Sequence, residues 1–204
     1  LASKGKIDSA KAIIEKINGQ NKSAELLNEI QDSFKEEKGS ILVLFNSGLR
    51  PAVDVGLSVS RVGGDAQIKA TKQVAGKLKL ILATYRELAA FSQFASDLDD
   101  DTKARIDSGR KYVELLKQKQ NEPVPFYKQA VSIYAANAGI FDAAPVENTQ
   151  KIEASFLEFV ERDRKSVMDA IETGRELTEE VVAGLDKAIV DYKEAHAANY
   201  EVVA

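Results

Sequence analysis

The sequence predicts a mainly α protein, in which a C-terminal bundle of about five helices follows one short strand and an N-terminal helical hairpin. Three observations support this fold class. Apolar residues after Gly64 recur at spacings of three and four, which is the period of a helix with one buried face. Glycine, proline and aspartate interrupt this pattern where helices would end or begin. Hydrophobic residues form 44% of the 204 residues, which is enough to build the core of one domain.

The first part of the chain predicts a helical hairpin over residues 1–39. Apolar residues share one face in each half, and Gly19 and Gly39 lie where helix C-terminal caps are expected. The hairpin lacks the basic recognition face of a DNA-binding helix-turn-helix, so we interpret it as a packing element. Residues 41–45 then form a short apolar run that ends at a turn signal, Asn46-Ser47-Gly48, as buried strands do.

The periodic segments after residue 65 predict the helices of the bundle. Aspartates at 99–101 suit the positive end of a helix dipole, and Thr178 is a suitable N-cap. Pro123 and Pro125 end one helix and Gly174 ends another. The expected helices run over about 66–93, 99–118, 126–137, 152–174 and from 178 onward.

Composition excludes several classes of function. The formal net charge is -4 and the pI is near 5.3, so no basic surface for nucleic acid is expected. The chain has no cysteine, which excludes disulfides and thiolate zinc sites, and its one histidine, His196, has no second ligand to share a metal with. No apolar run reaches the ~20 residues of a membrane-spanning helix, and the start is not a signal peptide.

The sequence also lacks the elements of an independent nucleotide hydrolase. It contains no Gly-x-x-x-x-Gly-Lys-Ser/Thr phosphate loop and no apolar strand that ends in a magnesium-binding aspartate. No serine or threonine has the setting of a nucleophile elbow. The chain is therefore not expected to be active as an enzyme alone. Because it begins at Leu1 and not at Met, we expect a processed product, an expressed fragment or an incomplete reading of a longer chain.

Three segments resemble, in the same order, the alpha subunit of the rotary F-type ATP synthase. They are GLRPAVDVGLSVSRVGG at 48–64, YRELAAFSQFASDLD at 85–99 and LLKQKQ at 115–120. The resemblance covers about residues 41–204, the C-terminal portion of that subunit. It implies that residues 40–64 are a remnant of the nucleotide-binding domain and that residues 65–204 are the C-terminal helical bundle domain. The hairpin at 1–39 has no counterpart in the family, and its role is unknown.

The resemblance implies that Arg61 is an arginine finger, which enters the catalytic site of an adjacent beta subunit. A guanidinium can bridge two phosphate oxygens and keeps its charge, so it suits the stabilisation of a transferring phosphoryl group. Gly63 and Gly64 are expected to form a turn that brings the backbone close to the subunit boundary. The alternative interpretation is that Arg61 forms a salt bridge with a neighbouring helix of its own chain.

The resemblance also implies an adenine pocket for a nucleotide that is not turned over, lined by Arg50, Pro51, Gln118 and Gln120. Glutamine amides offer both a donor and an acceptor to a purine edge, and a proline ring offers a flat apolar contact. Without a phosphate loop the affinity should be poor. The alternative is that both glutamines are solvated residues at a helix end.

The loop that contains Asp97 and Asp99 resembles the part of the alpha subunit that contacts the rotating gamma stalk. Acidic side chains in this loop can pair with basic residues of the stalk. A helix cap followed by a solvated run of charge is the alternative, and both can hold. The spacing and the closing glutamate of a calcium loop are absent, so no metal site is expected.

As a whole, the resemblance implies a part of the catalytic hexamer of a proton-translocating ATP synthase, with Arg61 acting in trans and the helices forming a collar around the rotor. Expected partners are the beta and gamma subunits, the remaining part of alpha and the delta subunit. ATP or ADP with magnesium is expected in the complete assembly, and none is expected to be firmly bound by this chain alone. The expected location is peripheral to an energy-transducing membrane, on the bacterial cytoplasmic face or its organellar equivalent, with membrane contact only through the complex.

A second hypothesis comes from a different class of function. The chain would then be a non-catalytic interaction or assembly module, which derives from the alpha subunit and binds beta or the stalk without supporting turnover. The sequence upstream of Leu1 discriminates between the two, because a preceding reading frame with a phosphate loop would indicate a split or truncated alpha subunit.

Overall fold

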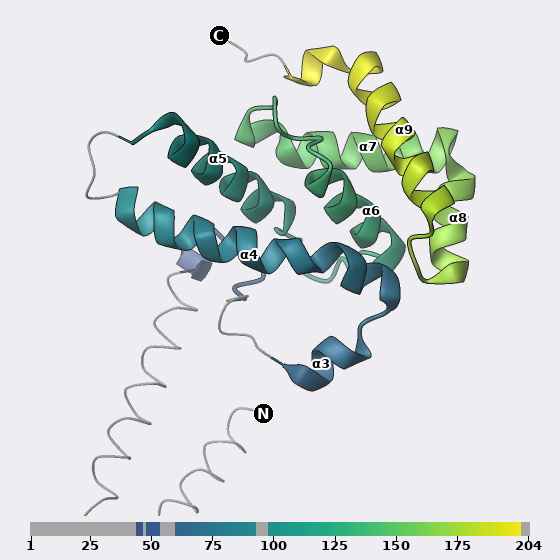
Figure 1. Cartoon of the computed structure of the whole chain (residues 1–204), viewed down its shortest axis with the longest axis horizontal. Coiled ribbons are helices and arrows are strands. Elements are labelled where there is room, and N and C mark those ends of the chain that lie inside the picture. The colour runs from purple at the N-terminus through teal and green to yellow at the C-terminus, as the bar shows by residue number, and fades with distance from the viewer. Residues whose placement is uncertain (1–43, 47, 54–59, 93–97, 201–204) are drawn as a thin grey trace, which may run out of the picture. The chain divides into compact units, whose positions relative to one another are not determined.

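The computed structural model describes residues 44–46, 48–53, 60–92 and 98–200 (Figure 1). The chain divides into two compact units, Leu1–Gly48 and Leu49–Ala204. The predicted hairpin at 1–39 lies outside the described residues. In the first unit only a short helical segment, Leu44 to Asn46, and Gly48 are described, and the Gly48 amide donates to the Phe45 carbonyl over 3.1 Å.

The strand expected at 41–45 is wrong where it can be checked. Leu44 and Phe45 are helical, and residues 41–43 lie outside the described part of the chain. A short apolar run fits a strand or a helix equally well by its period, so the choice depends on neighbouring strands. A helix pairs its backbone groups within itself, whereas a lone strand leaves them unpaired. No strand occurs among the described residues that could pair with this segment.

The second unit is built from helices that follow one another closely. Its elements are α3 (Arg61–Ala66), α4 (Lys69–Ser92), α5 (Asp100–Leu115), α6 (Phe126–Asn137), the 3-10 helix η1 (Val146–Asn148), α7 (Thr149–Asp163), α8 (Lys165–Gly174), α9 (Glu179–Ala195) and the 3-10 helix η2 (Ala197–Tyr200). This confirms the expected mainly helical fold. The match is closest for 126–137, where the helix begins and ends as predicted.

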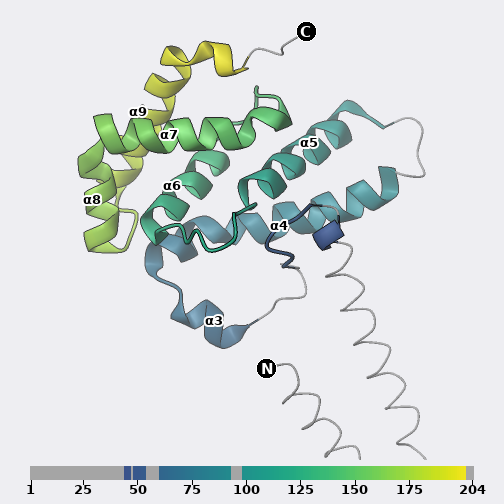
Figure 2. The same ribbon diagram turned by 180° about the vertical axis from the view of Figure 1, so that it is seen from behind.

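The long helix α4 lies against α5 and α6, and α7 packs against the same two helices (Figures 1 and 2). Helices α8 and α9 contact α7 and α6 at the other end of this arrangement. The core lies where these elements meet. Its largest fully buried side chains are Tyr192, Phe156, Ile140, Ile152, Ile171, Leu185, Val131 and Val160. Burial of this apolar surface is the main stabilising term of the bundle.

One expected helix is interrupted in the structure, and another begins later than expected, at Lys69. The segment predicted at 152–174 is divided into α7 and α8 at Arg164, whose backbone has φ -137° and ψ 35°. The Arg164 guanidinium binds Asp191 of α9 over 2.6 Å, which fixes the break by a contact outside the local sequence. Gln67, with φ -63° and ψ 139°, separates α3 from α4. In addition, α5 ends at Leu115, earlier than the expected Gln118.

Side-chain hydrogen bonds connect distant parts of the bundle. Gln73 of α4 donates from Nε2 to the Leu177 carbonyl over 3.0 Å and accepts at Oε1 from the Leu177 amide over 2.8 Å, across 104 residues. Beside it, the Ala70 amide donates to the Arg175 carbonyl over 2.9 Å. Together these contacts attach the start of α4 to the α8–α9 connection.

A second tie joins three helices through one amide. Asn137 at the end of α6 donates to the Val74 carbonyl of α4 over 3.0 Å and accepts from the Tyr112 hydroxyl of α5 over 2.9 Å. Tyr112 is buried, and burial raises its pKa to about 12, with a smaller contribution from Asp142. The hydroxyl therefore stays protonated and continues to donate at neutral pH.

The contact between α4 and α5 predicts a strong effect of a single methyl group. A Cβ at Gly109 would lie 2.4 Å from Tyr85 Cβ and 2.5 Å from its Cγ, and no side-chain rotation relieves the first contact because the backbone fixes Cβ. We therefore expect Gly109→Ala to lower the free energy of unfolding by about 1–3 kcal/mol. The matched control is Gly76→Ala in α4, where nothing beyond the adjoining residues and the helix's own backbone lies within 4 Å of the new Cβ. It should stabilise by about 0.5–1 kcal/mol, as helical Ala does relative to Gly. Urea unfolding of both variants checks this, and equal stabilities would contradict the close approach.

The cap of α5 predicts a pH dependence. Asp99 Oδ1 accepts from the Thr102 amide over 2.6 Å, and this hydrogen bond is the main cause that lowers the pKa of Asp99. A lowered carboxyl pKa stabilises the fold above the unfolded value of about 3.9, and this contribution is lost as the pH falls through the folded value. Asp99→Ala should thus be less stable than wild type at pH 7 but not at pH 2. Asp99→Asn still caps the helix, so its stability at pH 7 should lie between those of wild type and Asp99→Ala. Thermal melts at pH 2 to 7 measure these differences. Equal melting temperatures of wild type and Asp99→Ala at pH 7, or a difference that does not change with pH, would contradict the role of the charged cap.

Candidate functional site

Arg61 is the first residue of α3, and its side chain is exposed. Ser60 precedes it in an extended conformation and caps the helix, since its Oγ accepts from the Gly63 amide over 2.9 Å. No ion pair joins Arg61 to an acidic residue anywhere in the described ranges. The alternative of a salt bridge to a neighbouring helix therefore finds no support there.

The turn expected at Gly63 and Gly64 is wrong, because both residues lie inside α3. The capping hydrogen bond from Ser60 explains this difference, since it pairs an amide that the first turn of a helix leaves unpaired. The Gly64 amide likewise donates to the Ser60 carbonyl over 2.9 Å. Arg61 is thus presented by a capped helical turn and not by a glycine loop.

The structure brings together two segments of the expected adenine pocket. The Gln118 amide donates to the Arg50 carbonyl over 2.8 Å, which places Arg50 and Pro51 beside the connection that follows α5. Arg50, Pro51 and Gln118 are all exposed. This contact joins residues 68 positions apart in the sequence, as their numbers show.

The two glutamines lie beyond the end of α5, and both are exposed. The Gln118 side chain donates from Nε2 to the Glu122 carbonyl over 2.6 Å. The side-chain amide nitrogen of Gln118 is thereby bound within the α5–α6 connection, while the side-chain oxygen Oε1 accepts from no described residue. Among the described residues, no hydrogen bond joins Gln120 to Arg50 or Pro51, so of the two glutamines only Gln118 is joined to this segment by a hydrogen bond.

Of the two residues expected to contact the rotor, Asp97 lies outside the described residues. Asp99 is exposed and caps α5 through the Thr102 amide, as the alternative interpretation holds. Asp100 and Asp101 follow in the first turn and favour the positive end of the helix dipole. Asp99 therefore has a structural role whether or not it also contacts a partner.

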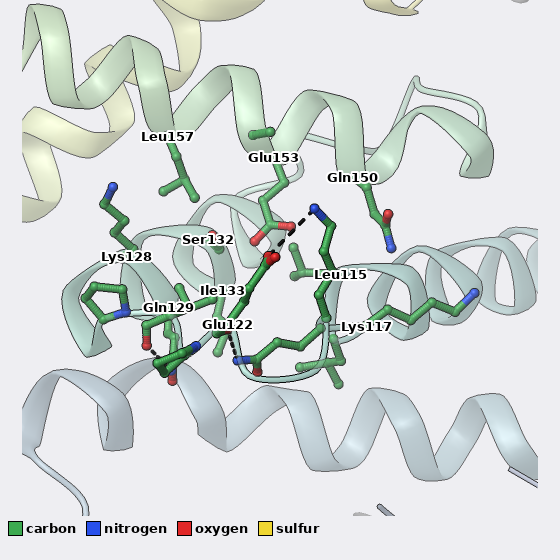
Figure 3. A pocket seen from close by; sticks show the side chains of 17 residues that line it. Leu115, Lys117, Glu122, Lys128, Gln129, Ser132, Ile133, Gln150, Glu153 and Leu157 are labelled. Atoms are coloured by element: carbon green, nitrogen blue, oxygen red, sulfur yellow. Dashed lines mark hydrogen bonds and ion pairs between the residues drawn. The ribbon is translucent and has the colours of Figure 1, made fainter. Parts of the chain in front are cut away.

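A groove of about 580 Å³ opens between the end of α5, the α5–α6 connection, α6 and α7 (Figure 3). Gln118 lines it, whereas Arg50, Pro51 and Gln120 do not. Glu153 of α7 and Ser132 of α6 face one another inside it. Neither residue was identified from the sequence. One signal was available: Glu153 lies between Ile152 and Phe156 in sequence and thus borders the buried face of α7.

Burial raises the pKa of Glu153, and the Ser132 hydroxyl opposes this to a smaller extent. Ser132 is 3% exposed, and its Oγ makes no well-formed hydrogen bond to any described residue. The lysines that line the groove already have acidic partners: Lys119 lies 3.6 Å from Glu122, and Lys128 lies 3.0 Å from Glu161. Lys117 pairs with Glu114. The Glu153 carboxylate is thus the one without a basic partner among the described residues of this groove.

Other site classes find no support in the described ranges. No group of three or more His, Cys, Asp or Glu side chains there is placed to hold a metal ion. Among the described helices, none has both the length and the apolar character needed to cross a membrane. His196 is partly buried and stacks on Tyr192, with ring centroids 4.3 Å apart and planes inclined by 19°.

Comparison with known proteins gives a consistent result. The family model described as "ATP synthase alpha/beta chain, C terminal domain" matches residues 67–192, the span from the start of α4 almost to the end of α9. ATP synthase subunit alpha of Desulfovibrio desulfuricans is 55% identical over 155 residues, which cover 76% of this chain and 31% of the relative. The corresponding subunit of a Sulfurovum species is 51% identical over 154 residues, with the same coverage of 76% and 31%.

A third relative, ATP synthase subunit alpha of a Parafrankia species, is 50% identical over 151 residues and is covered to 27% of its length. The chain thus spans about a third of the relatives it matches. The family-model match includes Gln118, Gln120 and Asp99 and begins after Arg61. With the helical fold and the extent of this match, the chain belongs to the ATP synthase alpha/beta chain family and contains its C-terminal domain.

Proposed function

We propose that this chain supplies Arg61 in trans to the catalytic site of an ATP synthase beta subunit, and that its helices contribute to a collar around the central rotor. The observation that carries the first part is the placement of Arg61. Its side chain is exposed at the start of a capped helix and has no acidic partner among the described residues. A guanidinium in this position is available to a neighbouring subunit.

The chemistry of the residue type suits this role. A guanidinium donates several N–H groups from a planar fork, so it can contact two oxygens of a phosphoryl group at the same time. Its charge does not depend on pH in the physiological range. As negative charge spreads over the transferring group, a fixed cation lowers the energy of the transition state, and such residues contribute about 10³–10⁵ in rate in other phosphoryl-transfer systems.

The proposal includes a nucleotide that is bound but not turned over. Arg50, Pro51 and Gln118 are brought together by the hydrogen bond between the Gln118 amide and the Arg50 carbonyl, which supports their role in an adenine pocket with Gln120. Gln118 Oε1, which accepts from no described residue, can accept from the adenine amino group. ATP or ADP with magnesium would be held by the complete assembly, whose other parts supply the phosphate site.

The proposed setting is a proton-translocating ATP synthase that lies peripheral to an energy-transducing membrane. Its partners would be the beta and gamma subunits, the remaining part of alpha and the delta subunit. Similarity to alpha subunits supports this setting. In this proposal Asp97 and Asp99 contact the gamma stalk, and Asp99 also retains its capping hydrogen bond because Oδ2 stays available.

The test is reconstitution of the chain with beta, gamma and the part of alpha that bears the phosphate loop. Arg61→Ala should lower multisite ATP turnover by about 10³-fold or more, because the transition-state charge loses its cation. Arg61→Lys should recover part of this loss, since it restores the charge without the planar fork. The matched control is Arg110→Ala, an exposed arginine of α5, which should leave turnover unchanged.

Assembly of each variant is followed by native mass spectrometry, so that a loss of turnover is separated from a failure to assemble. Full turnover in an assembled Arg61→Ala complex would refute the catalytic role. The non-catalytic interaction module would then be the better account of the chain.

A further inference from the structure

Helix α3, which carries Arg61, is not held in place by apolar packing. It has six residues, none of which is buried, and it lies beyond the start of α4, apart from the other helices (Figures 1 and 2). Two of the six, Gly63 and Gly64, are glycines, which disfavour a helix. A helix this short is also marginal by itself. The position of Arg61 therefore depends on the connection to α4 and on polar contacts at the two ends of α3.

Side chains satisfy backbone groups at both of these ends. At the first end, Ser60 Oγ accepts from the Gly63 amide, as described above. At the other end the last carbonyls of a helix have no partner within it. Here Lys72 of α4 donates from Nζ to the Asp65 carbonyl over 3.2 Å. An ammonium is a strong donor to such a carbonyl, because its charge adds to the hydrogen bond.

Lys72 can hold α3 because its own backbone is attached to the bundle. Its amide donates to the Ile68 carbonyl over 3.1 Å, and Ile68 packs against the core. The next residue, Gln73, exchanges two hydrogen bonds with the backbone of Leu177. The contact with Asp65 thus links α3 to a firmly attached part of α4.

We propose that Lys72 is a positioning residue for Arg61. Its ammonium holds the last turn of α3 through the Asp65 carbonyl, and together with the Ser60 cap it sets the direction in which the guanidinium leaves the bundle. This inference rests on the proposed role of Arg61 in trans. Direction matters there, because a guanidinium stabilises a transferring phosphoryl group only when its donors face the phosphate oxygens. Lys72 itself contacts no reacting group in this proposal.

The first test measures the mobility of α3 in the full chain and does not depend on turnover. The chain has no cysteine, so Val62→Cys, at a position that is 80% exposed, gives a single site on α3 for a nitroxide label. Lys72→Met removes the ammonium and keeps most of the aliphatic stem. In electron paramagnetic resonance spectra it should shift the equilibrium between the immobile and mobile components about two- to tenfold towards the mobile one, as loss of one hydrogen bond does. Lys72→Arg, which restores a charged donor, should recover most of the immobile component. The matched control is Lys77→Met, an exposed lysine of α4 with no hydrogen bond to α3 among the described residues, and it should leave the spectrum unchanged.

The second test measures ATP turnover in the assembly reconstituted with beta, gamma and the part of alpha that bears the phosphate loop. Lys72→Met should lower kcat about two- to tenfold and leave the KM for ATP unchanged, because the interaction that it weakens is made in the transition state. Lys72→Arg should recover most of kcat, and Lys77→Met should have no effect. In an Arg61→Ala background, Lys72→Met should cause no further loss, since a positioning residue acts only through the group that it positions.

An unchanged label mobility in Lys72→Met, or the same loss of kcat with and without Arg61, would overturn the inference. The two measurements also separate its failure from that of the proposed function. Full turnover of an assembled Arg61→Ala complex would refute the role of Arg61 in trans, and with it the catalytic part of this inference. Greater label mobility in Lys72→Met would in that case still show that Lys72 holds α3.

Discussion

The structure depends on how the start of α4 is attached to the other end of the bundle. Gln73 exchanges two hydrogen bonds with the backbone of Leu177, and the Ala70 amide donates to the Arg175 carbonyl beside them. These bonds are partly buried, and a two-point contact of an amide with one residue fixes orientation as well as distance. Without these bonds, the start of α4 would be held by apolar contacts and by the exposed ion pair of Lys69 with Glu176, which fix its position less strictly.

This attachment matters for the proposed function, because α3 is connected to α4 by only Gln67 and Ile68. Ile68 is partly buried against the core, so the connection has little freedom. Arg61 therefore lies on a short capped helix, and this helix is held in place through α4 and its contact with the α8–α9 connection. The same bundle carries the α5–α6 connection, which holds Arg50 through the Gln118 amide. One scaffold thus positions Arg61 and the contact between Arg50 and Gln118, which belong to two of the three sets of residues that the resemblance to alpha subunits singles out.

The sequence predicted what local signals determine. α6 lies between Pro125 and a glycine at 139, and α9 begins at a threonine cap, so both were located well. The break at Arg164 was not predictable, since it depends on Asp191 of another helix. The adenine residues and Arg61 were named from motifs, but the helical setting of Arg61 and the groove at Glu153 were not. The groove depends on side chains that meet only in three dimensions, and the spacing of apolar residues does not report such contacts. The helix at Arg61 begins at a local cap, Ser60, which the sequence interpretation did not use.

Amide hydrogen exchange in wild type and Gln73→Ala tests most directly whether this attachment holds the start of α4. The account predicts faster exchange in the variant at Leu177, which loses its acceptor, and also at Ala70, whose bond to the Arg175 carbonyl is intact but depends on the same alignment. Amides in the middle of α6 should exchange as in wild type. Faster exchange at Leu177 with an unchanged rate at Ala70 would contradict the account, because α4 would then be positioned without Gln73.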